Sequence, residues 1–394
     1  MSQPTILAIA SYFKGEDFLR ECRARGARVI LLTVEELKDE AWPREAIDDF
    51  RWMPDLLNRT NVVNAVSWLA RSERIDRIVP LDEFDLEMAA VLREHLALPG
   101  MGSTATLSFR DKLRMRMQAD EAGIDVPSFT SLVNDAAIGE WTSRVPPPWI
   151  LKPRGDAATK GIRRIDEPSQ LWPTLDALGD RRSFFLLERF IEGDVFHVDG
   201  IVDNGRLVFG EAHGYARPPF EVTRGGGLFM SRTLERQADI ARSLLGLTGE
   251  LVATLGIARG AVHAEFIRGR AESDPLFLEI AARVGGAHIA DMVEAASGVN
   301  LWREWAAVEI ADVTGEPYRP PEPRRDYAGI IVSLARQEWP DDSGFDAPEI
   351  VWRLKKKHHI GFVMRSPGPE RVRELQAHYG ERIAREFSAS VPET

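Results

Sequence analysis

Gly260-Ala-Val-His-Ala-Glu-Phe-Ile-Arg-Gly269, followed after a polar turn by Pro275-Leu-Phe-Leu-Glu-Ile-Ala-Ala-Arg-Val-Gly-Gly286, is the stretch that decides the fold. Both runs have the apolar, strand-like pattern of paired β-strands, and Arg270-Ala-Glu-Ser-Asp274 between them predicts a hairpin. If the two strands pair in register, Glu265 and Glu279 become cross-strand neighbours in an apolar setting.

Alternation along each strand gives these carboxylates their predicted neighbours. We expect one face of the first strand to carry His263, Glu265 and Ile267, and one face of the second to carry Phe277, Glu279 and Ala281.

Two carboxylates at cross-strand distance repel each other, so they need a cation between them or a raised pKa. A magnesium ion bound by carboxylate and phosphate oxygens would satisfy them. Arg283, four residues after Glu279, would then face the same phosphates. The alternative is a half-exposed hairpin in which one carboxylate points to water, and the pair alone does not decide between the two.

The composition is that of a soluble globular protein. The chain has 394 residues, 44% of them hydrophobic and 28% charged, which is enough for two or three domains. The net charge of −11 argues against nucleic acid or an anionic membrane as the main partner. The basic run from Arg353 to His359 fits a solvated strand edge better than a nucleic-acid site.

Cysteine content and apolar runs indicate the compartment. Cys22 is the single cysteine, so an intrachain disulfide is excluded. The N-terminal apolar run is too short for a signal peptide, and the sequence contains no apolar stretch of membrane-spanning length. We therefore expect a cytoplasmic protein.

The first hundred residues predict an open parallel α/β domain. Strand patterns at Thr5–Ala10, Arg28–Thr33 and Arg77–Pro80 alternate with helical segments. No GxGxxG follows the first strand, so the dinucleotide-binding fingerprint is absent. Helices are also expected at Ser108–Ala122 and Leu234–Leu245.

A second informative segment runs from Trp149 to Gly161. Lys152 ends an apolar strand, and the small residues of loop 155–161, including Thr159 and Gly161, would let backbone N–H groups approach a polyanion. The spacing is not that of a Walker A motif. A flexible surface loop beside a snorkelling lysine is the alternative.

Two further segments carry weaker signals. Leu187-Glu-Arg-Phe-Ile-Glu-Gly-Asp194 is a strand leading into a short connection, where backbone groups suit an adenine edge and Glu188 and Asp194 suit its amino group and the ribose. Lys112 stands at the start of a helix, where a solvated first-turn residue is the alternative.

The order of these segments resembles the ATP-grasp superfamily over nearly the whole chain. The resemblance implies two α+β subdomains that close on ATP, preceded by an open α/β domain. It implies an N-terminal domain at 1–105, an ATP-grasp domain at 106–318 with a mobile lid at about 125–190, and a small C-terminal α+β region at 319–394.

The resemblance also implies roles for individual residues. Lys112 and Lys152 would contact phosphates, and loop 155–161, with Thr159 and Gly161, would form the phosphate lid. Glu188, Phe190 and Ile191 would line the adenine hinge, and Asp194 would bind the ribose. Glu265 and Glu279 would ligate Mg²⁺, with Mn²⁺ as a possible substitute, and Arg283 would act at the reacting phosphoryl group.

One position departs from the family pattern. Asparagine usually stands two residues after the second glutamate, where its oxygen binds a second magnesium ion, but this chain has Ala281. One ion would then suffice, or another group would substitute. A non-catalytic nucleotide-binding module stays open as an alternative.

Within the superfamily, the segment from Arg283 to Asp291 looks most similar to the amino-acid ligases. These carboxylate–amine ligases form amide bonds through an acyl phosphate, releasing ADP and phosphate. Gly285 and Gly286 would supply backbone donors for a carboxylate or an oxyanion. Arg224 would pair with a substrate carboxylate, with a surface-loop role equally open.

His288 is a candidate for the acceptor pocket, although packing on a helix face suits it better. The implied partners are small carboxylates and amines, without nucleic acid or membrane, and a homodimer is possible by family analogy. An ATP-grasp carboxylase or ligase of the purine or biotin type is the enzymatic alternative.

Overall fold

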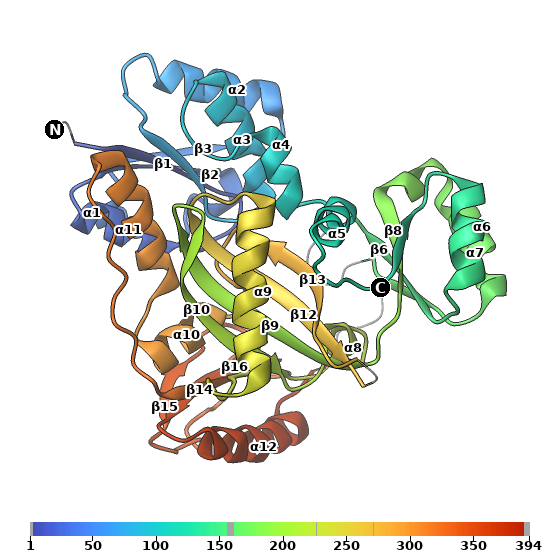
Figure 1. Ribbon diagram of the computed structural model, residues 1–394. Helices are drawn as coiled ribbons and strands as arrows, with labels where there is room; N and C mark the ends of the chain where they lie inside the picture. Colours follow the sequence, from blue (N-terminus) through green and yellow to red (C-terminus); the bar gives the residue numbers. More distant parts are fainter. Residues whose placement is uncertain (1–2, 156–160, 226, 271, 390–394) are drawn as a thin grey trace.

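The computed structural model describes residues 3–155, 161–225, 227–270 and 272–389 (Figure 1). The N-terminal part is a parallel sheet with the strand order β3-β2-β1-β4. Its strands and helices are β1 (Thr5–Ala10), α1 (Glu16–Ala24), β2 (Arg28–Val34), β3 (Asp49–Met53), α2 (Arg59–Leu69), β4 (Arg77–Pro80) and α3 (Leu86–His95). The open parallel α/β start predicted from the sequence is thereby confirmed.

A small lobe lies apart from the rest of the molecule, on the right of Figure 1. Its antiparallel sheet has the order β5-β8-β6-β7 and packs against two helices through a core that includes Trp141 and Trp149. The elements are β5 (Phe129–Ser131), α6 (Asp135–Arg144), β6 (Trp149–Pro153), β7 (Arg163–Ile165), α7 (Leu171–Leu178) and β8 (Phe185–Arg189). This lobe falls within the range expected for a lid, and its mobility stays a prediction.

The largest element is an eight-stranded antiparallel sheet with the order β13-β12-β9-β10-β11-β14-β16-β15. Its strands are β9 (Gly193–Asp203), β10 (Arg206–Tyr215), β11 (Phe229–Thr233), β12 (Gly260–Gly269), β13 (Leu276–Ala281), β14 (Tyr327–Leu334), β15 (Ile350–Arg353) and β16 (His359–Ser366). The C-terminal strands therefore continue the sheet that holds the carboxylate hairpin. The three expected domain ranges remain a prediction.

Helices cover both faces of this sheet. On one face α9 (Asp239–Leu255) packs on β9 and β10, and on the other α10 (Ile289–Ser297) and α11 (Leu301–Thr314) share a core with α1 of the N-terminal domain. The remaining helices are α4 (Ser103–Thr106), α5 (Lys112–Glu121), α8 (Pro219–Gly225) and α12 (Pro369–Glu386). Within the described part of the chain, no helix has the length and apolar character needed to cross a membrane.

Two expected helices differ from the structure for local reasons. The helix expected from Leu234 begins at Asp239, because the Leu234 N–H donates to the Ala212 carbonyl and extends the sheet pairing. The helix expected from Ser108 begins at Lys112, because the Asp111 side chain accepts from the N–H groups of the first turn and caps it.

Candidate active site

The hairpin places the two carboxylates as predicted. Glu265 on β12 is directly opposite Glu279 on β13, and His263 is directly opposite Ala281. A β-bulge follows, so that Phe266 pairs with Phe277. The prediction that Phe277 shares the face of Glu279 is therefore wrong.

The bulge turns Phe277 into the core beside α5, and Leu278 lines the cavity beside Glu279 in its place.

A cavity of about 520 Å³ lies between the small lobe and the large sheet. This volume is within the range of small-molecule sites. Seven of the residues singled out in the sequence line it: Lys112, Lys152, Glu188, Phe190, Ile191, Glu265 and Glu279. Apolar side chains supply much of the remaining wall, among them Ile150, Ile162, Val195, Phe220, Ile267 and Leu278.

Lys112 and Tyr215 hold the two carboxylates. The Lys112 ammonium lies 2.9 Å from Glu279 Oε2, and the Tyr215 hydroxyl donates to Glu265 Oε1 at 2.7 Å. Burial raises the pKa of Glu279, but Lys112 and Lys152 outweigh it and lower that pKa to about 2. Glu279 is therefore ionised at neutral pH and available to a cation.

Lys152 belongs to a buried charge network. Its ammonium lies 2.6 Å from Glu188 Oε2, and Arg116 Nε donates to Glu188 Oε1 at 2.7 Å. Burial lowers the pKa of Lys152 to about 8, against the opposing effect of Glu188. Both carboxylate oxygens of Glu188 thus accept from protein cations. Glu188 thus places Lys152, and the expectation that its side chain meets an adenine amino group stays a prediction.

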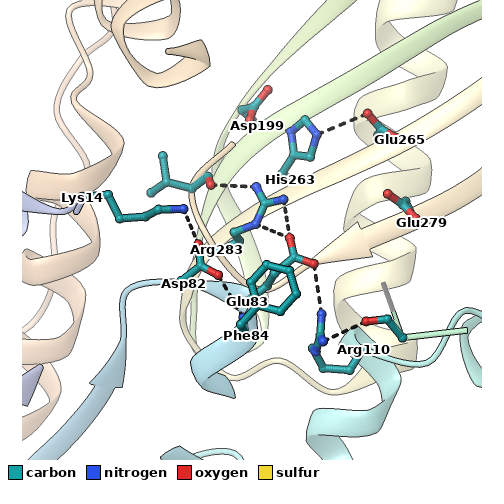
Figure 2. Close-up of polar contacts among 12 residues, drawn as sticks. Lys14, Asp82, Glu83, Phe84, Arg110, Asp199, His263, Glu265, Glu279 and Arg283 are labelled. Atoms are coloured by element: carbon teal, nitrogen blue, oxygen red, sulfur yellow. Dashed lines mark hydrogen bonds and ion pairs between the residues drawn. The ribbon is translucent and has the colours of Figure 1, made fainter. Parts of the chain in front are cut away.

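Arg283 is engaged with the N-terminal domain (Figure 2). Its Nε donates to Glu83 Oε2 at 2.6 Å, and Arg110 Nη1 donates to Glu83 Oε1 at 3.0 Å. Arg110 also donates to the carbonyl of Gly155, at the start of the predicted phosphate loop, at 2.8 Å. The guanidinium of Arg283 lies outside the lining of the cavity, so its action at the phosphoryl group stays a prediction.

A buried polar network stands behind Glu265. Asp199, which has no exposed surface, accepts from His263 Nδ1 at 2.9 Å and from His197 Nδ1 at 2.6 Å. His263 Nε2 lies 3.5 Å from Glu265 Oε1. Burial lowers the pKa of His263, but Asp199 and Glu265 outweigh it and raise that pKa to about 10. His263 thus carries a proton between two carboxylates when nothing else binds it.

Other predicted residues lie at or beyond the edge of the cavity. Asp194 is exposed, between the lining residues Gly193 and Val195. Gly161 has a positive φ of 74° and stands next to the lining residue Ile162.

Two predicted residues cannot be placed. Thr159 lies outside the described residues, and so does the side chain of Arg224, whose backbone belongs to α8. Their proposed roles remain predictions.

The segment after β13 has an unusual backbone. Ala287 and His288 follow Gly285 and Gly286 with positive φ values of 51° and 62°. The His288 ring packs on Trp352 with centroids 4.6 Å apart, and its Nδ1 lies 3.1 Å from Asp291. His288 therefore packs at the start of α10, which is the role that the sequence favoured for it.

Several site residues were missed from the sequence. Arg116 lies one helical turn after Lys112, a spacing that places both on one side of α5. Asp199 was missed as well, although it alternates with His197 along β9 as Glu265 does with His263 along β12, so polar residues with a period of two inside apolar strands were the available signal. Glu83 follows a buried strand in the N-terminal domain and had no local signal.

Comparisons with known proteins give relatives in sequence and in structure. No protein-family model matches the chain. It is 26% identical over 242 residues to the L-arginine-specific L-amino acid ligase of Bacillus subtilis, covering 60% of this chain and 58% of that protein. It is 26% identical over 170 residues to the D-alanine–D-alanine ligase of Nitrosomonas eutropha, covering 39% and 54%. The chain thus spans somewhat over half the length of these curated relatives.

Solved structures share the fold over almost the whole chain. The L-amino acid ligase of Bacillus licheniformis superposes with a TM-score of 0.73 at 18% identity, covering 100% of both chains. The N5-carboxyaminoimidazole synthetase of Staphylococcus aureus, solved with ADP, gives 0.71 at 17% identity, covering 95% of this chain and 96% of that one. With its open α/β start, its small lobe and its carboxylate hairpin, the chain has the ATP-grasp fold of these solved structures, and its sequence is similar to those of an L-amino acid ligase and of D-alanine–D-alanine ligases.

Proposed function

We propose that this protein is an ATP-dependent ligase that joins the carboxylate of an amino acid to an amine or to a second amino acid. The observation that carries the proposal is the in-register pair Glu265 and Glu279, which faces Lys112 and Lys152 in one cavity. The sequence relatives, an L-amino acid ligase and two D-alanine–D-alanine ligases, support the class of reaction.

The residues of the cavity fit a magnesium–nucleotide complex. Glu265 and Glu279 offer the oxygen ligands that Mg²⁺ prefers, and they lie at cross-strand distance, where a cation relieves their repulsion. Lys112 and Lys152 supply positive charge for phosphates beside them. Phe190, Ile191 and the other apolar lining residues suit a purine base.

In this reaction ATP supplies the phosphoryl group. A carboxylate oxygen of the substrate attacks the γ-phosphorus, the bond to the β–γ bridging oxygen breaks, and ADP leaves. The amine then attacks the acyl carbon, an amide C–N bond forms, phosphate leaves with the C–O electron pair, and the nitrogen loses a proton.

The protein's part is positional and electrostatic. Lys112 and Lys152 place positive charge beside the phosphates, where charge develops during transfer. The Glu188 carboxylate, fixed by Arg116, holds the Lys152 ammonium in position. Closure of the small lobe over the cavity would exclude water, which protects an acyl phosphate from hydrolysis.

The deciding experiment measures ADP and phosphate release with Mg-ATP against a panel of amino acids, supplied singly and in pairs. We expect release that requires a pair, with a product lighter than the two substrates together by one water. Glu279→Gln should abolish release, because it removes a metal ligand. Glu272→Gln, in the turn of the same hairpin, is the matched control and should retain it.

A nucleotide-binding module without turnover is the second candidate, and Ala281 is the observation that favours it. ATP binding without ADP release for any pair of amino acids would support this candidate and contradict the ligase. Release with bicarbonate in place of an amino acid would instead indicate a carboxylase.

A further inference from the structure

His263 is placed beside the carboxylate pair by the register of the hairpin. It stands opposite Ala281, and these two residues form the next cross-strand pair on the face that carries Glu265 and Glu279. Alternate positions of a strand share a face, so the imidazole lies on the side of the sheet that carries the carboxylates. Figure 2 shows its ring directed at Glu265, with Nε2 3.5 Å from Oε1. Ala281 offers only a methyl group there, whereas the imidazole brings a ligand atom to within 3.5 Å of Glu265 Oε1.

The orientation of this imidazole is fixed by a hydrogen bond to Asp199 through the ring nitrogen that faces away from Glu265. His263 Nδ1 donates to Asp199 Oδ1 at 2.9 Å, and Asp199 has no exposed surface. Metal-binding histidines commonly donate one ring N–H to a carboxylate, which fixes the tautomer and points the second nitrogen at the ion. The Asp199–His263 pair has this arrangement, with Nε2 directed toward the proposed magnesium site.

We propose that His263 is a nitrogen ligand of the divalent ion bound by Glu265 and Glu279, oriented by Asp199. The inference rests on the proposed function, since it needs an ion at that carboxylate pair. An ion binds the neutral imidazole, so Nε2 of His263 would carry the ion and Nδ1 would keep its proton toward Asp199.

The neighbouring histidine provides an internal contrast. His197 also donates to Asp199 through Nδ1, but its Nε2 lies 2.7 Å from the Ser231 hydroxyl and is already engaged. His197 is therefore a member of the supporting network without a free ligand atom. The two histidines share one carboxylate and differ in where their second nitrogen points.

A nitrogen ligand changes which ion the site prefers. Mg²⁺ selects oxygen ligands, whereas imidazole suits first-row transition ions. We therefore expect the ratio of Mn²⁺ to Mg²⁺ affinity to fall in His263→Gln, which replaces the nitrogen ligand by an amide. Asp199→Asn should weaken Mn²⁺ binding about 10- to 100-fold, the range found for groups that orient a ligand.

Pulsed electron paramagnetic resonance of bound Mn²⁺ tests the proposal directly. The full-length protein would carry ¹⁵N in its histidine rings and would be saturated with Mn²⁺ and a non-hydrolysable ATP analogue of natural isotope content. We expect ¹⁵N hyperfine coupling of a directly bound imidazole, lost in His263→Gln and kept in His197→Gln. Bound Mn²⁺ without ¹⁵N coupling in the wild-type protein would overturn the proposal, whatever the variants do.

Failure here is distinguishable from failure of the proposed function. Amine-dependent ADP release together with absent ¹⁵N coupling would leave the ligase intact and refute the role of His263. Coupling that His263→Gln removes, without ADP release from the wild-type protein, would establish His263 as a ligand and refute the ligase.

Discussion

Glu188→Gln is the perturbation with the most predictable consequence for stability. The Glu188 carboxylate accepts from Arg116 and Lys152 at 2.7 and 2.6 Å, and the three side chains are 4%, 0% and 9% exposed. Removing one partner of a buried ion pair leaves an uncompensated charge and costs about 3–5 kcal/mol. The lower end is expected, because Lys152, whose pKa burial already lowers to about 8, can lose its proton when the partner charge is gone.

The loss of stability should be measurable in the strands that carry Lys152 and Glu188. Lys152 is on β6 and Glu188 on β8, which pair with each other in the small lobe. Amide hydrogen exchange of these two strands therefore reports the local free energy of opening. A loss of about 3 kcal/mol corresponds to about a hundredfold faster exchange, since each factor of ten is about 1.4 kcal/mol.

The matched control is Glu272→Gln. Glu272 pairs with Arg189 at 2.7 Å, but the side chains are 22% and 43% exposed, so the pair contributes less than about 1 kcal/mol. Equal acceleration of exchange in the two variants would refute the reasoning, because burial would then have no bearing on the strength of these pairs.

Three further predictions concern packing, pH and thiol reactivity. Gly285→Ala should destabilise the protein by about 1–3 kcal/mol in urea unfolding, because its Cβ would lie 2.5 Å from Asp199 Oδ1 and 3.1 Å from His263 Nδ1. Gly286→Ala, whose Cβ meets nothing within 4 Å, should be nearly neutral, and equal losses would contradict this. The pKa of Glu279 falls from about 4.3 in the unfolded chain to about 2 in the folded protein, so its contribution is present at neutral pH and lost between about pH 4 and pH 2. Between those pH values the free energy of unfolding should therefore fall less steeply with decreasing pH in Glu279→Gln than in the wild-type protein. Identical slopes would contradict the lowered pKa of Glu279. Burial raises the pKa of Cys22 well above its ordinary value, so a thiol reagent should label it only after unfolding, and labelling of the native protein would contradict its burial.

The carboxylate hairpin was predictable because its information is local. Alternation and a polar turn define two strands, and the in-register pairing of Glu265 with Glu279 is confirmed. Lys112, Lys152, Phe190 and Ile191 were found in the same way, each at a strand or helix end, and all line the cavity. Their roles toward ATP stay predictions.

Contacts between residues that are far apart along the chain could not be predicted from the sequence. Glu83 and Arg283 are 200 residues apart along the chain, and no periodicity relates them. The bulge that moves Phe277 into the core also left no local signal, since it depends on how two strands accommodate each other's side chains. Burial of Glu188 between two cations likewise depends on α5 meeting β6 and β8 in the folded protein.

The order of strands in the large sheet has a consequence for biosynthesis. The edge that carries the site is built from β9, β12 and β13, which are complete once the ribosome has released residue 281. The partner of β11 is β14, nearly a hundred residues later in the chain, at Tyr327–Leu334. During that interval β11 presents unpaired backbone groups, which are a template for aggregation. The nascent chain is therefore most exposed to misassembly on β11, and a chaperone that binds extended apolar segments would be most useful while residues 234–326 are being made.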